Sequence, residues 1–176
     1  MDGVQGGAAG SVIVIADTSP LNYLIQLGLV EYLPDLYDEI VIPQSVLQEL
    51  SNLGSPLVVR DWAYSSPDWV IVRSVGALDP TLPPRLGAGE REAISLAIEL
   101  HAGMLLIDDL PGRNAAEERG LSITGTLTIL LQISLLSGID FETKLAELVQ
   151  LGFRASESIL ERIREAFLKN RQSGSL

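Results

Sequence analysis

Short apolar segments alternate with amphipathic segments along most of this sequence. The apolar segments, such as SVIVIA at residues 11–16 and MLLI at residues 104–107, predict strands that are buried on both faces. We expect strands at residues 11–16, 39–42, 69–72, 104–107 and 121–123. The alternation predicts an α/β fold, a three-layer α/β/α sandwich around a central parallel sheet of about five strands.

Proline and glycine mark where the helices between these strands begin and end. Pro20 and Pro43 suit the first turn of a helix, whereas Gly28 and Gly103 suit a helix end. We expect helices at residues 20–28, 29–33, 43–54, 57–64, 90–103, 113–119, 126–137, 141–151 and 156–170, and a Pro-rich loop at 76–86. No linker or repeat divides the chain. Residues 11–170 are therefore predicted to form one domain, between a flexible tail at 1–10 and a frayed tail at 171–176.

Composition limits the chemistry that this chain can perform. The sequence has no cysteine and one histidine, His101, which excludes thiolate chemistry and metal sites built from several histidines. Any metal would have to bind oxygen ligands, which points to Mg²⁺ or Mn²⁺. The formal net charge of −11 argues against a broad basic surface for nucleic acid, but it does not exclude such a substrate, because bound cations invert the local field.

The sequence also indicates where the protein works. The most apolar segment, residues 125–139, is short and interrupted by polar residues, so it predicts a core helix and not a membrane span. The Gly-rich start has no basic region typical of a signal peptide. We expect a cytoplasmic protein with no membrane contact.

Acidic residues follow two of the predicted strands directly. Asp17 ends the first strand, and Asp108 and Asp109 end the fourth. In a parallel sheet, ligands bind beyond the carboxyl ends of the strands. Because side chains alternate along an extended chain, Asp108 and Asp109 cannot both face this crevice while the strand continues. One is expected to face it with Asp17, and the other to cap a helix or to support the site.

Three glutamates lie on the helices that follow the second and third strands. Glu49 lies between apolar neighbours, and Glu90 and Glu92 open the helix at 90–103. Each has an ordinary structural explanation, since acids favour the positive end of a helix and exposed helix faces. As a set, however, they place several carboxylates where a divalent cation would neutralise them.

Five short motifs follow one another in the order that is typical of a known protein family. They are IVIADTSPLNYLIQLG, VIPQSVLQEL, GAGEREAISLA, LLIDDLPGR and SITGTLTIL, which span roughly residues 13–136. Together they resemble the PIN-domain ribonucleases, in particular the VapC-like toxin branch. The resemblance implies a PIN-like sandwich and a metal-dependent endoribonuclease that hydrolyses RNA phosphodiesters, with Mg²⁺ or Mn²⁺ as cofactor. It also implies a toxin of a toxin–antitoxin pair, with a small antitoxin partner and a homodimer.

The resemblance assigns roles by position. It implies that Asp17, Glu49, Glu90 and Asp109 are catalytic and bind metal, with Glu92 as a rival to Glu90. Asp108 remains an alternative metal ligand, because the family's usual Thr is replaced by Ile107. Residues proposed to contact the substrate are Thr18, Ser19 and Arg113, with Arg85 and Arg91 as further candidates for phosphate contacts.

Other classes fit less well. A receiver-like phosphoacceptor would need its acid pair after the first strand and a later lysine, but the only lysines are Lys144 and Lys169. A haloacid-dehalogenase-like phosphatase would need Asp-x-Asp, which Asp17-Thr18-Ser19 lacks, and no Walker A sequence is present. The remaining alternative is a weakly active or inactive PIN-like domain that acts as a binding scaffold.

Overall fold

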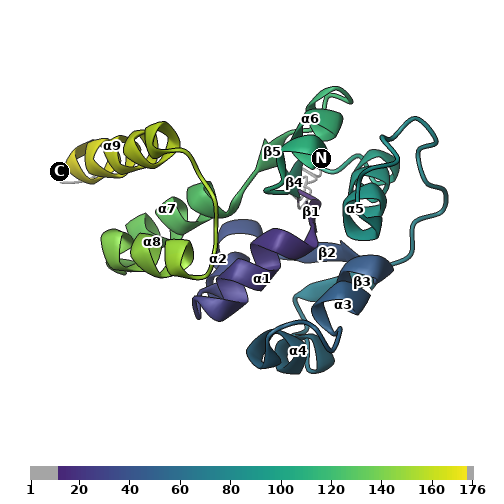
Figure 1. Cartoon of the computed structure of the whole chain (residues 1–176), viewed down its shortest axis with the longest axis horizontal. Helices are drawn as coiled ribbons and strands as arrows, with labels where there is room; N and C mark the ends of the chain where they lie inside the picture. The colour runs from purple at the N-terminus through teal and green to yellow at the C-terminus, as the bar shows by residue number, and fades with distance from the viewer. Residues whose placement is uncertain (1–11, 174–176) are drawn as a thin grey trace, which may run out of the picture.

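A five-stranded parallel sheet forms the centre of the protein, as the sequence predicts. The computed structural model describes residues 12–173. The strands are β1 (Val14–Ala16), β2 (Ile40–Pro43), β3 (Val70–Arg73), β4 (Met104–Leu106) and β5 (Ile123–Thr124). Their order across the sheet is β3-β2-β1-β4-β5, and each neighbouring pair is parallel (Figure 1).

Helices cover both faces of the sheet. They are α1 (Thr18–Gln26), α2 (Leu33–Tyr37), α3 (Gln44–Leu50), α4 (Leu57–Tyr64), α5 (Ala88–Glu99), α6 (Leu110–Glu117), α7 (Thr126–Ser137), α8 (Phe141–Gln150) and α9 (Glu157–Ser173), with a 3₁₀ turn at η1 (Val30–Tyr32). The larger hydrophobic cluster packs α1, α3, α4, α7 and α8 on one face, and the smaller cluster packs α5 and α6 on the other (Figure 1).

Alternation along the strands creates these two cores. Val14 and Ala16 point into the larger cluster, whereas Ile15 between them belongs to the smaller one. In β4, Leu105 and Leu106 divide in the same way. All five side chains are at most 2% exposed, which is why these strands appear as continuous apolar runs in the sequence.

Three helices begin earlier than predicted, and the first is α1, which begins at Thr18 and not at residue 20. Helix α6 begins at Leu110 and not at residue 113, because Pro111 lies inside its first turn, where the missing N–H of proline costs nothing. Helix α5 begins at Ala88, so that Gly89 belongs to the first turn instead of preceding the helix. Glu90 then occupies the third helical position and accepts a hydrogen bond from the backbone N–H of Gly87 at 2.9 Å.

The structure describes only part of the two predicted tails. Helix α9 continues to Ser173, three residues past its predicted end. The predicted tail at residues 1–10, and residues 174–176 of the second tail, lie outside the described residues. Within residues 12–173, no helix is long and apolar enough to cross a membrane.

Candidate active site

The strand order brings the acids of the first and fourth strands together. Strands β1 and β4 are neighbours, with Ala16 paired to Leu106, and Asp17 donates its backbone N–H to the Leu106 carbonyl at 2.9 Å. The chain turns from β1 towards β2 on one side, and returns to β4 on the other. This is the switch point at which an open parallel sheet forms its ligand crevice. Asp17 and the acids that follow β4 therefore lie at the same edge of the sheet.

Asp17 is the most deeply buried of these acids. Its side chain is 3% exposed, and its carboxylate does not cap α1, although the residue occupies the N-cap position. Burial is the main cause that raises its pKa from 3.8 to about 7; the charges of Glu90, Glu49 and Asp108 contribute to this rise, and the Thr18 backbone N–H opposes it. The helix-cap explanation is thus insufficient for Asp17.

Glu49 reaches across from α3 to the same edge. Its Oε2 accepts a hydrogen bond from the Thr18 hydroxyl, and its Oε1 accepts one from the Gly89 backbone N–H at 2.9 Å. A Cβ atom at Gly89 would lie 2.6 Å from Oε2, so only glycine permits this close approach. Thr18 therefore positions an acid in this structure, and Glu49 links α1 to the first turn of α5.

The two glutamates of α5 have different surroundings. Glu92 Oε2 accepts a hydrogen bond from the Ser45 backbone N–H at 3.1 Å, so Glu92 caps the start of α3. Glu90 faces the acids instead: burial raises its pKa, and the charges of Asp109 and Glu49 add to the effect, partly offset by the Gly87 N–H. Its Oε1 is buried without a hydrogen-bond partner in the described part of the chain.

Asp108 and Asp109 are separated by their partners. Asp108 accepts hydrogen bonds from both the backbone N–H and the hydroxyl of Thr126, at 2.7 and 2.6 Å, which anchors the start of α7. Burial raises the pKa of Asp108, whereas Thr126 and Arg113 lower it. Asp109 is exposed at the N-cap position of α6, and its side chain makes no cap hydrogen bond there. The structure thus gives Asp108 a structural partner and leaves the Asp109 carboxylate open.

Of the residues predicted to contact the substrate, some lie beside these acids and others do not. Arg113 donates from Nη1 to the Ile107 carbonyl at 2.9 Å, beside Asp108, and Ser19 lines a small hollow with Asp108 and Asp109. Arg85 and Arg91 do not line either of the hollows at this edge that the described residues form. Sequence reasoning assigned no role to Thr126, although it lies in the SITGT motif, since a hydroxyl partner for Asp108 is visible only in three dimensions.

These acids have the donor chemistry of a site for a hard divalent cation. All of their ligating atoms are oxygens, one of them is buried without a partner, and burial beside like charges makes ionisation of Asp17 costly. Both oxygens of Glu49 and both oxygens of Asp108, however, accept hydrogen bonds from protein donors. Within residues 12–173, no three acidic or histidine side chains are already arranged to hold a metal ion.

Comparisons with solved structures find chains of similar fold. The fold is similar to a PilT N-terminus domain protein, SSO1118, from the hyperthermophilic archaeon Sulfolobus solfataricus P2, with 20% identity, a TM-score of 0.46, and coverage of 82% of this chain and 98% of that one. It is also similar to the PIN domain endonuclease Utp24, with 16% identity, a TM-score of 0.48, and coverage of 64% and 83%. No curated protein matches the sequence.

The family model described as DUF3368, a PIN domain, matches residues 13–168. That range includes both strand ends, all the acids of the candidate site and most of α9. PIN domains are generally nucleases and typically use divalent metals. The chain belongs to the PIN-domain family.

Proposed function

We propose that this protein is a divalent-metal-dependent endoribonuclease. Its active site is the acidic edge of the sheet, formed by Asp17, Glu49, Glu90, Asp108 and Asp109. The observation that carries the proposal is Asp17, a carboxylate 3% exposed, whose burial, together with three further acids nearby, raises its pKa to about 7. A buried cluster of this kind is unfavourable for folding unless a cation neutralises it. A metal at this edge would supply Lewis-acid stabilisation of the phosphate and an activated water for phosphodiester hydrolysis.

The proposed ligands are Asp17, Glu49, Glu90 and Asp109. Glu90 contributes the buried Oε1 that has no hydrogen-bond partner among the described residues, and Asp109 contributes an exposed carboxylate. Asp108, with both oxygens bonded to Thr126, is proposed to hold the start of α7 in place beside the site. Asp108 as a metal ligand is the alternative assignment.

The protein's own residues prepare the site in several ways. Thr18 and the Gly89 N–H hold Glu49 towards Asp17. Arg113 keeps a positive charge beside Asp108, where it lowers the pKa of that carboxyl. Burial behind β1 and β4 excludes water from one side of Asp17, which strengthens its attraction for a cation relative to an exposed carboxylate.

The proposal is tested by incubating labelled RNA with the purified protein in Mg²⁺, in Mn²⁺ or in EDTA. Cleavage in at least one metal, its loss in EDTA and its return when the metal is restored are the expected results. Cleavage that persists in EDTA would contradict the metal requirement. Absence of cleavage under all conditions, together with RNA binding, would favour the alternative function of a binding scaffold.

We further propose that the protein is a toxin. This role is supported only by the resemblance of the sequence motifs to the VapC-like branch. It includes a small antitoxin partner, a homodimer and a cytoplasmic location. Induced expression of the protein in bacteria should then arrest growth, and expression of Asp17→Asn should not. Normal growth with both proteins would contradict the toxin role but not the nuclease activity, which the RNA assay measures separately.

A further inference from the structure

A groove opens directly onto the acidic edge. It has a volume of about 630 Å³ and lies between the starts of α6 and α7 on one side and α9 with its preceding connector on the other. A smaller hollow of about 310 Å³ shares Asp108, Asp109, Phe153 and Arg154 with it. A ligand lying in the groove would therefore have one end at the candidate active site.

The groove gathers arginines in an acidic protein. The chain has 23 acidic residues and 12 lysines and arginines, yet Arg113, Arg154 and Arg162 line this one groove. Arg154 and Arg162 are exposed, and in residues 12–173 no acid lies within ion-pair distance of either. Arg164 on the same helix is paired with Glu142 and Glu157. Arg154 and Arg162 are thus available to an anion from outside.

Apolar side chains line the same groove. Leu110 is 66% exposed and Ile159 is 38% exposed, and both face the groove together with Phe153. Exposed apolar surface beside unpaired arginines suits a ligand that carries both phosphates and accessible base faces. A single strand of RNA presents both, whereas a duplex hides its base faces by stacking and pairing.

Ring contacts hold the walls of the groove. Tyr23 of α1 packs edge-on against Phe153 with ring centroids 5.2 Å apart, which fixes the connector that carries Arg154. Phe141 of α8 stacks on Phe167 of α9 at 4.6 Å. Helix α9 lies beside α7 (Figure 1), and its Leu160 and Ile163 pack on the larger core cluster.

We propose that this groove is the binding site for the RNA strand beside the scissile phosphate, with Arg154 and Arg162 contacting its phosphates. The inference rests on the proposed ribonuclease function and extends it to residues outside the acidic edge. Arg154, which lines both hollows, would bind nearest the acids, and Arg162 one turn into α9 would bind further along the strand.

The test measures binding without cleavage. Fluorescence anisotropy with a labelled single-stranded RNA of about twelve nucleotides, a length within the usual site sizes of single-strand binders, is recorded in the Asp17→Asn background over a range of salt concentrations. Arg154→Gln with Arg162→Gln should weaken binding by about tenfold and reduce the slope of log K against log salt by about 1.4, the effect of two lost phosphate contacts. The same RNA as a duplex should bind more weakly than the single strand.

Lys169→Gln is the control for charge on the same helix as Arg162, since it removes one positive charge outside the groove. It should leave the affinity within about twofold of its parent. The inference is overturned if the double variant binds as its parent does, if Lys169→Gln weakens binding equally, or if the duplex binds better. Because both arginines are exposed, thermal unfolding should show no change in the double variant.

The two proposals fail in different ways. If the protein with an intact acidic edge does not cleave RNA but the double variant loses binding, the nuclease function fails and the groove assignment stands. If metal-dependent cleavage occurs and the double variant cleaves and binds as well as the unmodified protein, the nuclease function stands and the groove assignment is wrong.

Discussion

At the scale of single residues, burial and neighbouring charge determine which acids have a function. Asp17 and Asp108 both follow buried strands, but only Asp108 has its charge met by two hydrogen bonds from one residue, Thr126. Asp17 lies 3% exposed among other acids. A carboxylate kept in such a place destabilises the folded protein when it ionises, so its presence calls for a partner cation.

The raised pKa of Asp17 predicts how stability depends on pH. The folded protein holds this proton more tightly than the unfolded chain, with a pKa of about 7 against 3.8, so the contribution of Asp17 to stability is fully present below about pH 4 and is lost as the pH rises to about 7. In EDTA, the free energy of unfolding should fall over this window by up to about 4 kcal/mol more in the wild type than in Asp17→Asn. Urea denaturation at a series of pH values measures this, and parallel pH profiles would contradict it.

The adjacent aspartates should separate stability from activity. Asp108→Ala removes two hydrogen bonds at the start of α7 and should cost about 1–2 kcal/mol of unfolding free energy. Asp109→Ala should change stability by less than about 0.5 kcal/mol but abolish RNA cleavage, because it removes a proposed ligand. Chemical denaturation and cleavage assays on both variants check this. If Asp109→Ala cleaves normally while a folded Asp108→Ala does not, the two roles are reversed.

At the scale of elements, the first turn of α5 places both glutamates of the site. Gly89 lies in this turn, and a Cβ there would meet the Glu49 carboxylate at 2.6 and 2.9 Å. Alanine is otherwise the better helix residue by about 1 kcal/mol. Gly89→Ala should therefore preserve or raise the melting temperature while it displaces Glu49 and slows cleavage by about 10- to 100-fold.

Gly54→Ala provides the control for this prediction. Its Cβ would meet nothing closer than the Asn52 side chain at 3.4 Å, so a methyl group in this exposed turn would touch none of the acids. Cleavage by this variant should be unchanged. Equal cleavage by Gly89→Ala and the wild type would show that the position of Glu49 does not matter.

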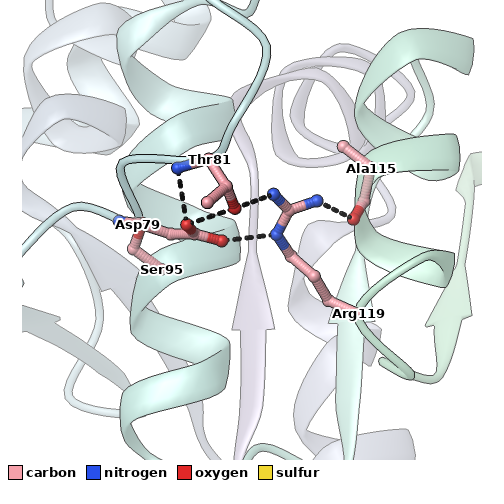
Figure 2. A network of polar contacts seen from close by, with 5 residues as sticks. All are labelled: Asp79, Thr81, Ser95, Ala115 and Arg119. Carbon is pink, nitrogen blue, oxygen red and sulfur yellow. Dashed lines mark hydrogen bonds and ion pairs between the residues drawn. The ribbon is translucent and has the colours of Figure 1, made fainter.

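The loop between β3 and α5 is held by a polar network that sequence reasoning did not find. Arg119, just after α6, donates to Asp79 and to the Thr81 hydroxyl at 2.8 Å, and to the Ala115 carbonyl at 2.8 Å (Figure 2). Ser95 of α5 accepts the Asp79 backbone N–H at 3.0 Å. The network ties the Pro-rich loop to both helices that cover this face of the sheet.

This network predicts a second pH effect of opposite sign. Hydrogen bonds from Thr81 and Arg119 lower the pKa of Asp79 from 3.8 to about 2, so its contribution to stability is present above about pH 4 and is lost as the pH falls through 2. Asp79→Asn should lower the melting temperature at neutral pH, and the difference from the wild type should vanish near pH 2. A difference that is constant with pH would contradict this account.

The elements themselves could be predicted because burial leaves a clear signal in the sequence. The helices at residues 57–64 and 126–137 have the predicted bounds, and β1 and β4 appear as apolar runs ending in acid. The start of α6 is less clear from sequence, because Pro111 and Gly112 usually interrupt a helix but here lie within its first turn. The partners of Asp79 and Asp108 lie 40 and 18 residues away in sequence, and no local pattern identifies contacts of that kind.

At the scale of the whole molecule, topology converts scattered acids into one site. Strands β1 and β4 are separated by nearly ninety residues in the chain but lie side by side in the sheet, and α3 and α5 direct their glutamates to the same edge. The chain has a net charge of −11, but the groove beside the acids contains Arg154 and Arg162, which form no ion pair within residues 12–173. A cation at the edge and a strand of RNA in the groove would together offset the negative field.

The most direct test of this account is RNA cleavage by Asp17→Asn beside Asp35→Asn. Both variants remove one negative charge, but Asp35 is exposed on α2, away from the sheet edge. The account predicts that Asp35→Asn cleaves RNA in Mg²⁺ or Mn²⁺ at the wild-type rate, whereas a folded Asp17→Asn loses about 100-fold or more of the activity, as expected when a metal ligand at a catalytic centre is removed. Equal cleavage by the two variants would contradict it.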